Sequence, residues 1–478
     1  MTYIMLSVIV LVLSGCSDFL VREPKLSQSN ELTLSTYTGL NSAVAGAYSY
    51  ISATGWYGQS WIIDADMRSG NGVKDKVRDS NRCAQGYNWN YTPDNTSEIW
   101  ASAYVLTSAV NNVIDNLEGK EDGDVTKQDL DNLKAESLFL RAFAHFHCVL
   151  TYAQPYTYDK TSLGVPVVLH TDPKGKPARE TVEKVYGQIV ADLLEAESII
   201  DPEYVRKGGA DEKSYASIDV IRAFLSRVYL YMGEWQNAAN YATKVIDSGN
   251  YTMWTPADYP TVWGKEIAGD GGEVIFEVYG KITNSTWGSW EDLSYLTKPD
   301  GSGDPMVSKD LLALYDAADV RYTAGFRTTT TNNESGRLWT NKYPGKGDAE
   351  ERDCNNVIVL RLSEMYLTRA EAILNGAAVE GVTKEADINI VRTNRNIAAI
   401  GSVTAKDIRD ERRRELAWEG HYIYDLARWN TAVTRTDFTL GSMNQNVPFP
   451  DYRWALPIPQ RELNVNPNLE QNEGYSKN

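Results

Sequence analysis

Apolar side chains recur along most of this chain with the spacing of an α-helix. In residues 133–153, LKAESLFLRAFAHFHCVLTYA, the side chains of Leu133, Leu140, Ala144 and Cys148 follow at intervals of seven or four positions, which predicts a long amphipathic helix. Further runs of this kind lie near residues 36–52, 97–118, 180–200, 217–248, 358–375, 384–397 and 404–430. The pattern therefore predicts a mainly α-helical protein.

One of these runs contains a turn that divides it into two helices. In SIDVIRAFLSRVYLYMGEWQNAANYATKVIDSG, residues 217–249, Gly233 marks a tight turn between a helix ending near Leu230 and another beginning near Trp235. Small residues at the crossing and a glycine in the turn are typical of a tetratricopeptide-like helix pair. Because one pair cannot bury its apolar face alone, further pairs are expected, and RLSEMYLTRAEAIL at 361–374 resembles the first helix of another.

Three long tracts interrupt the helical pattern, near residues 53–95, 250–355 and 431–478. They are rich in Gly, Asn, Asp, Trp and Tyr, which favours turns and irregular structure. Within the second tract, EVIFEV at 273–278 has the composition of a strand. In a helical scaffold, tracts of this length usually carry the functional residues.

The N-terminal residues have the composition of a secretory signal. Residues 1–15 contain no charged side chain, and residues 4–13 are almost wholly apolar, a run shorter than the ~20 residues of a membrane-spanning helix. Its end, Leu-Ser-Gly-Cys, resembles the lipobox of bacterial lipoproteins. This resemblance implies that residues 1–15 are a signal peptide and that Cys16 is acylated, so that residues 16–478 are anchored to a membrane by lipid.

Charge and aromatic composition narrow the choice of ligand. The formal net charge is −17 and the isoelectric point is near 4.8, so we expect no nucleic-acid partner. The chain has 13 Trp and 29 Tyr against 9 Phe. Trp and Tyr combine a flat apolar face with a polar edge, which suits stacking on sugar rings. The excess therefore favours ligand binding.

The residues that carry catalytic or metal chemistry form no recognised motif. His145 and His147 are two positions apart on a predicted helix and point to different sides, which does not suit a shared metal. The sequence lacks His-Glu-x-x-His, Gly-x-Ser-x-Gly and a phosphate-binding glycine loop. We therefore expect no enzyme activity, no metal and no cofactor. Two questions stay open: a pair of carboxylates that cleaves glycosides, and a disulfide between Cys83 and Cys354.

Several stretches resemble the SusD/RagB family of outer-membrane nutrient-binding lipoproteins. They are RDERRRELAWEGHYIYDLARWN (409–430), similar to the signature helix of the family; LPIPQRELNVNPNLEQNEGY (456–475), similar to its closing motif; AESLFLRAFAHFH (135–147) followed by LGVPVVL (163–169), similar to its central helix and the segment after it; and CSDFL (16–20), similar to its mature N-terminus. Along the chain, the four motifs follow in the order expected for the family and extend over essentially the whole mature chain, so the resemblance is specific.

The resemblance implies a fold, a place and a partner. Members have a scaffold of about four tetratricopeptide-like helix pairs with long loop-rich insertions and a few short strands. They are lipid-anchored on the cell surface at the outer membrane of Bacteroidetes and cover a SusC-like TonB-dependent barrel transporter, to which they pass oligosaccharides or, in some members, peptides. They are not enzymes.

Residues 409–430 have a structural explanation of their own. The aliphatic positions that share one face of the predicted helix are Ile408, Leu416, Ile423 and Leu426. Asp410 is spaced to pair with Arg413 and Arg414, and Gly420 allows a close approach or a bend. We assign this helix to the fold rather than to a ligand site.

Two aromatic clusters in the long tracts are the candidate oligosaccharide sites. The first lies in the ligand-binding region near 53–95 and includes Trp56, Trp61 and Trp89; the second lies in the region near 250–355, in TNSTWGSWEDLSYL, and comprises Trp287, Trp290 and Tyr295. The second cluster is favoured, because it follows a strand-like segment and lies where the glycan sites of the family often fall. The alternatives are a peptide-capturing member of the family, a tetratricopeptide-like adaptor for protein partners, and a glycoside hydrolase.

Overall fold

The computed structural model describes residues 33–74, 82–121, 123–206, 212–264, 272–280, 292–328, 337–346, 354–438 and 444–476. Cys16, Trp287 and Trp290 lie outside these residues. Within them, the chain is mainly helical with a few short strands, as the hydrophobic pattern predicts.

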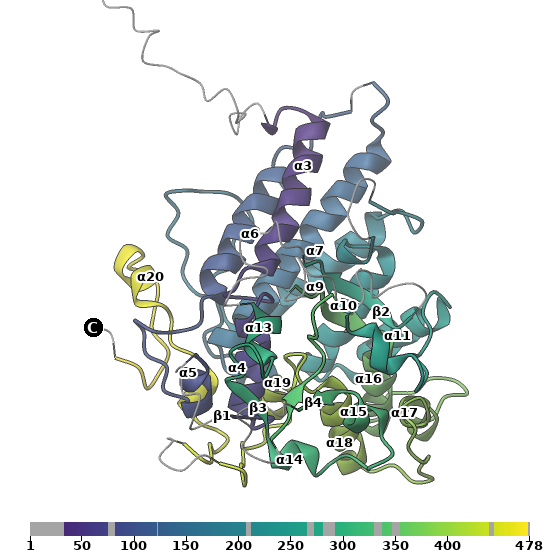
Figure 1. Cartoon of the computed structure of the whole chain (residues 1–478). Helices are drawn as coiled ribbons and strands as arrows, with labels where there is room; N and C mark the ends of the chain where they lie inside the picture. The colour runs from purple at the N-terminus through teal and green to yellow at the C-terminus, as the bar shows by residue number, and fades with distance from the viewer. Residues whose placement is uncertain are drawn as a thin grey trace, which may run out of the picture.

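Four consecutive helix pairs form the scaffold of the described residues (Figure 1). The pairs are α3 (Tyr37–Tyr48) with α6 (Ile99–Ile114), α7 (Lys127–Tyr152) with α9 (Val182–Ile199), α10 (Ile218–Met232) with α11 (Trp235–Asp247), and α16 (Leu362–Leu374) with α17 (Lys384–Thr393). Gly233 adopts φ +74° between α10 and α11, a conformation that a glycine takes without strain. The prediction of a turn at this residue is confirmed, and so is the tetratricopeptide-like scaffold.

Helix α7 lies at the centre of the main hydrophobic core. Its N-terminus is fixed by a capping box between Thr126 and Asp129, which satisfies two backbone N–H groups. Most of its side chains are buried, because α6 packs against one side and α9 against another. His147 donates from Nδ1 to the Phe143 carbonyl at 2.7 Å, so its Nε2 accepts from the Tyr57 hydroxyl at 3.0 Å. Both histidines of this helix are buried in the core, His145 at 1% and His147 at 0% exposure.

Three short antiparallel strand pairs occur among the described residues. Strand β2 (Val274–Val278) pairs with β6 (Val357–Arg361), β1 (Gly72–Lys74) with β3 (Pro305–Val307), and β4 (Phe326–Arg327) with β5 (Trp339–Thr340). The strand predicted at 273–278 is confirmed, whereas residues 358–361, predicted as helix, form β6. Both β2 and β6 are fully buried. In an apolar run that is buried on all sides, hydrophobic and polar residues do not alternate, so the sequence pattern cannot distinguish a strand from a helix.

Short helices occupy parts of the tracts that were predicted to lack them. They are α4 (Ser60–Ser69), α5 (Ala84–Asn88), α12 (Tyr259–Val262), α13 (Leu293–Thr297), α14 (Lys309–Leu312), α15 (Val320–Thr323), η4 (Tyr452–Trp454) and α20 (Gln460–Val465). Outside these tracts, the short helices are η2 (Ser49–Ser52), α8 (Tyr156–Asp159) and η3 (Glu212–Ser214). Most are one turn long, and side-chain caps begin several of them. A single turn is too short to produce a hydrophobic period in the sequence.

The run 404–430, predicted as one helix, is two helices. Helix α18 (Ala405–Leu416) ends before Trp418 and Gly420, which adopt φ +62° and +82°, and α19 (Tyr422–Arg428) follows. A Cβ on Gly420 would lie 2.7 Å from ring atoms of Trp61, so the predicted close approach and bend are both confirmed. The prediction that the aliphatic residues of this run share one helix face is wrong. Ile408 packs in a small cluster with Leu367, whereas Ile423 and Leu426 belong to the main core.

Asp66 holds the bend between these two helices. Its Oδ1 accepts hydrogen bonds from Asn71 Nδ2 and from the Trp418 N–H, each at 2.8 Å, and its Oδ2 accepts from the Gly420 N–H at 3.4 Å. Burial raises the pKa of Asp66 to about 6, although these donors act against the rise. The carboxylate on α4 therefore fixes the bend between α18 and α19.

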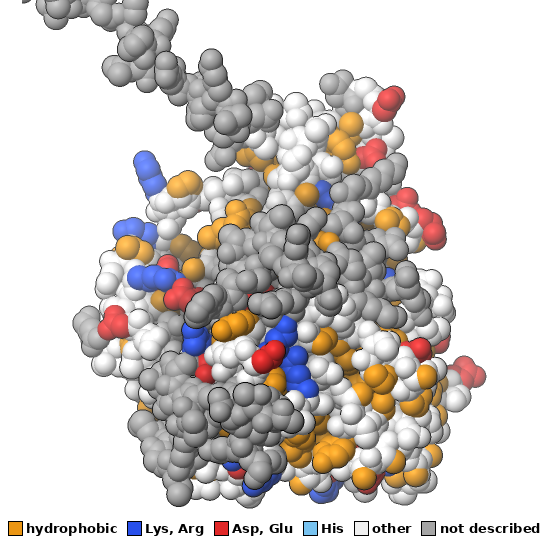
Figure 2. All heavy atoms as spheres, in the orientation of Figure 1, with side chains coloured by type: hydrophobic (Ala, Val, Ile, Leu, Met, Phe, Trp, Pro, Cys, Tyr) orange, Lys and Arg blue, Asp and Glu red, His pale blue; other side chains and the backbone are white. Residues whose placement is uncertain are grey.

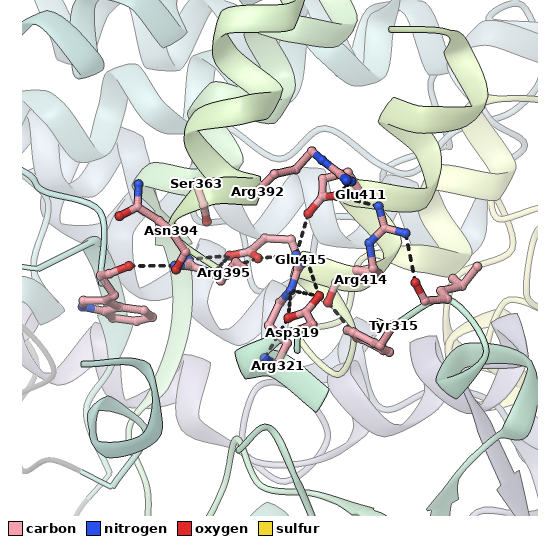
Figure 3. A network of polar contacts seen from close by, with 12 residues as sticks. Tyr315, Asp319, Arg321, Ser363, Arg392, Asn394, Arg395, Glu411, Arg414 and Glu415 are labelled. Carbon is pink, nitrogen blue, oxygen red and sulfur yellow. Dashed lines mark hydrogen bonds and ion pairs between the residues drawn. The ribbon is translucent and has the colours of Figure 1, made fainter. Parts of the chain in front are cut away.

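The charges of α18 pair mainly with other elements rather than along the helix (Figure 3). Glu415 forms ion pairs with Arg321 of α15 and with Arg395, which follows α17. It also pairs with Arg361 of β6. All four side chains are at most 1% exposed. The predicted pairs of Asp410 are absent among the described ion pairs, in which Asp410 contacts Lys406. The helix therefore belongs to the fold, through long-range pairs that spacing along one helix does not reveal.

Candidate functional site

The three tryptophans predicted as the first aromatic cluster are buried. Trp56 meets the ring of His147 edge-on at 5.3 Å, and Trp61 stacks on Tyr424 at 4.5 Å with an interplanar angle of 10°. Trp89 donates from Nε1 to the Arg68 carbonyl at 3.0 Å. All three belong to the main core, so in this structure they fasten the tract to the scaffold and offer no ring face for a sugar to stack on.

The second cluster is described only at Tyr295, which lies half-buried on α13. Asp292 caps this helix by accepting from the Ser294 N–H at 2.6 Å. The Leu293 N–H donates to the Gly58 carbonyl at 3.2 Å. The structure therefore brings the two predicted ligand-binding tracts together at this point, which we call the loop junction: Gly58, residues 292–297 and residues 301–304.

The loop junction is held by a tight turn after α13. The Tyr295 carbonyl accepts from the Ser302 N–H at 3.0 Å, and a Cβ on Gly301 would lie 2.3 Å from that carbonyl oxygen. Only a glycine fits there, because any other side chain would collide with backbone. Trp339 Nε1 donates to the Gly303 carbonyl at 2.9 Å. Tyr295 thus projects from a framework that backbone contacts fix.

Charged groups of both signs surround this framework. Arg82 Nη1 lies 3.7 Å from Asp304 Oδ2, and the Ser302 hydroxyl donates to the same oxygen at 2.8 Å. Arg327 Nη2 donates to the Tyr343 carbonyl at 3.3 Å. On the face shown in Figure 2, basic and acidic side chains lie next to one another near the place that α13 occupies in Figure 1. Such alternating donors and acceptors suit hydroxyl groups better than a ligand of one charge.

Two open cavities of the described surface lie away from the loop junction. One, of about 560 Å³, lies between α6 and α20, and the other, of about 640 Å³, lies between α8 and the segment around η4. The second exposes Tyr158 and Tyr452. Sequence reasoning missed both residues, because a single tyrosine at the end of one short helix differs in no way from the other tyrosines of the chain.

The titratable core residues have structural roles. Burial lowers the pKa of His145 and of His147 to about 3 and raises the pKa of Asp64 to about 6. Cys83 and Cys354 are buried thiols and form no disulfide with each other. Within the ranges that the structure describes, no three His, Cys, Asp or Glu side chains lie together as metal ligands. No helix in those ranges has the length and apolar character needed to cross a membrane.

Comparison with known proteins identifies the family. A family model described as starch-binding proteins associating with the outer membrane matches residues 18–230, and a model of the SusD family matches residues 321–475. A crystal structure of a SusD superfamily protein from Bacteroides thetaiotaomicron is 30% identical, covers 91% of this chain and 99% of its own, and superimposes with a TM-score of 0.80. The chain belongs to the SusD family.

Named relatives extend over most of the chain. SusD-like protein P2 of Formosa agariphila is 25% identical over an alignment of 525 positions, gaps included, which covers 98% of this chain and 98% of its own. The starch-binding protein SusD of Bacteroides thetaiotaomicron is 24% identical over an alignment of 467 positions, gaps included, which covers 81% of this chain and 80% of its own. The resemblance stated from four motifs is therefore confirmed, and it includes the regions between them.

Proposed function

We propose that this SusD-family protein captures oligosaccharides at the cell surface and delivers them to a SusC-like TonB-dependent transporter without cleaving them. The observation that carries the proposal is the match to SusD-family proteins along nearly the whole chain. One of these relatives is named a starch-binding protein, and one matching family model is described as associating with the outer membrane. Membership of this family supports binding as the function of the chain.

The ligand site proposed here is the loop junction with the segment that precedes it. Tyr295 supplies an aromatic ring on a rigid turn, and Arg82, Asp304 and Arg327 supply polar groups around it. Trp287 and Trp290 precede Tyr295 in the same segment and are proposed to stack on sugar rings. Aromatic faces combined with a few oriented polar groups are the usual means of binding sugars.

The proposal also includes the anchor and the domain division. Residues 1–15 are proposed to be removed as a signal peptide, and acylated Cys16 to hold residues 16–478 at the outer membrane. A Cys16→Ser variant should then be released from the membrane fraction, and wild-type protein should incorporate labelled palmitate. Equal membrane retention of both proteins, with no label, would contradict the lipid anchor.

A titration tests capture and its site together. The chain beginning at Ser17 is titrated with a panel of plant, host and microbial polysaccharides and a peptide mixture. We expect binding to one glycan class and a loss of about tenfold or more in affinity in Trp287→Ala and Trp290→Ala. Tyr322→Ala, which removes a tyrosine that is 39% exposed on α15, should bind as wild type does. Binding to peptides alone would favour the peptide-capturing alternative.

Delivery and the absence of catalysis have their own tests. We expect the native protein to co-purify from outer membranes with a TonB-dependent barrel, and its failure to do so would favour an adaptor function. Incubation with the bound polysaccharide should release no new reducing ends. New reducing ends would show a glycoside hydrolase and overturn the assignment of a binding protein.

A further inference from the structure

The cavity between α8 and the segment around η4 is an open groove with a volume of about 640 Å³. This volume is within the roughly 300–1,000 Å³ of pockets that hold small ligands. It shares no lining residue with the loop junction. Its walls come from Gln154, Tyr158, Asp159, Ser162, Leu163, Pro450, Asp451, Tyr452, Ala455, Gln471, Asn472 and Glu473.

Two exposed tyrosines stand in this groove on rigid supports. Tyr158 is 46% exposed and meets the ring of Phe449 edge-on at 5.1 Å. Tyr452 is 43% exposed and meets the ring of Tyr475 edge-on at 5.0 Å. A Cβ on Gly474 would lie 2.4 Å from ring atoms of Tyr452, so the C-terminal segment passes directly against that ring. Both aromatic rings are therefore held in place before any ligand binds, which lowers the entropic cost of stacking.

Polar side chains line the groove beside the two tyrosines. Gln154 is one of them, and its Nε2 lies 3.4 Å from the Asp451 carbonyl. Ser162, Gln471 and Asn472 line the groove as well. Hydroxyl and amide groups both donate and accept hydrogen bonds, which suits the hydroxyl groups of a sugar.

The charges of the groove exclude acidic ligands. The residues that line it include the carboxylates of Asp159, Asp451 and Glu473 and no Lys or Arg. Arg453, outside the lining, pairs with Asp451 and holds the pKa of that carboxyl below its usual range, against the effect of burial. The side chains that line the groove thus carry a net negative formal charge, which disfavours uronic acids and sulfated sugars.

The other open cavity, between α6 and α20, has a different lining from the groove. Between α6 and α20, the exposed apolar side chains are Val105 and Val465, and Lys174 and Lys176 stand beside them. Trp100 and Tyr104 also line this cavity, but Trp100 is buried and Tyr104 is half-buried, and branched aliphatic side chains offer no flat face for a pyranose ring. The two cavities are similar in volume, so the two exposed tyrosines distinguish the groove near η4.

We propose that this groove is a second saccharide-binding site, which holds a neutral segment of the same oligosaccharide chain or of another one. Tyr158 and Tyr452 stack on sugar rings, and polar side chains of the lining form hydrogen bonds with sugar hydroxyl groups. The inference rests on the proposed function for its ligand class but not for its position. A protein with two separated sites would hold a long glycan more tightly than either site alone.

Calorimetry of the chain beginning at Ser17 tests the inference. The probes are maltoheptaose, cellohexaose, mannohexaose and xylohexaose, with oligogalacturonate as the anionic probe. For a neutral probe that binds, we expect two sites per chain in the wild type and one in Tyr158→Ala/Tyr452→Ala. Tyr322→Ala is the matched control and should keep both sites.

The outcomes separate this inference from the proposed function. If Trp287→Ala/Trp290→Ala abolishes all binding and the tyrosine variant changes nothing, the groove is no site and the proposed function stands. If the tyrosine variant alone loses binding, the groove stands and the site proposed at the loop junction falls. If the wild type binds no neutral probe, both proposals fall. Binding of oligogalacturonate that depends on Tyr158 and Tyr452 would overturn the assignment to neutral sugars.

Discussion

Glu415 is the side chain whose loss should most clearly destabilise this fold. Its carboxylate pairs with Arg321 at 2.8 Å, with Arg395 at 2.7 Å and with Arg361, and none of these groups is more than 1% exposed. Burial alone would raise the pKa of Glu415, but the guanidiniums of Arg395, Arg361 and Arg321 hold it well below its usual range. The group is therefore charged in the folded protein at any pH near neutral.

A Glu415→Gln substitution preserves the shape and removes the charge. Three buried guanidiniums then share the remaining carboxylates, and the new amide NH₂ faces donors. Removing one partner from a buried ion pair costs about 3–5 kcal/mol, because the other charge stays buried without compensation. We expect a loss of this size in the free energy of unfolding, which lowers the urea midpoint by roughly 1 M or less, because the m-value of a chain of 478 residues exceeds that of a small protein.

Urea unfolding followed by circular dichroism measures the loss. Asp410→Asn is the matched control: it removes an acid from the same helix, but the Lys406 partner of Asp410 has a side chain that is 79% exposed. Exposed pairs of this kind contribute about 0–1 kcal/mol, so the control should unfold close to wild type. A Glu415→Gln protein that unfolds within 1 kcal/mol of wild type would refute the reasoning that this network needs its central charge.

Three further predictions follow from buried groups. His145 and His147 have pKa values near 3 in the folded protein but titrate near 6.5 in the unfolded chain, so the free energy of unfolding should fall by roughly 4 kcal/mol between pH 7 and pH 5 on account of both. A variant with Phe at both positions should lose less stability over that range, and an unchanged dependence on pH would contradict this. Gly420→Ala should lower the free energy of unfolding by about 2 kcal/mol or more, because the new Cβ would collide with Trp61 at a residue of positive φ. Gly376→Ala is the control: its φ is +103° but its Cβ would meet no atom, so the same urea assay should show a loss of about 1 kcal/mol. Trp61→Ala should lower the free energy of unfolding by about 3–5 kcal/mol without changing saccharide affinity of the folded protein; a loss of affinity at unchanged stability would restore it as a ligand residue.

The helices could be predicted from the sequence because most of them have one face against the core. Periodicity located the helix pairs, and the glycine at 233 located the turn between α10 and α11. Periodicity failed for elements that are buried on all sides and for bends that depend on distant residues. Strand β6 is buried on every side, so its apolar run reads as helix, and the bend at Trp418 depends on a carboxylate of α4 that is more than 350 positions away in the chain. Contacts of that range leave no local pattern.

The aromatic residues show the same limit at the candidate sites. A tryptophan in a polar tract has the same sequence context whether it stacks on a sugar or pins its tract to the core, and Trp56, Trp61 and Trp89 do the second. Tyr158 and Tyr452, which are nearly 300 positions apart, become neighbours across one groove only because α8 and η4 meet in the fold. Exposure and a shared groove are therefore what separate Tyr158 and Tyr452 from the buried tryptophans, and both properties arise only after the chain has folded.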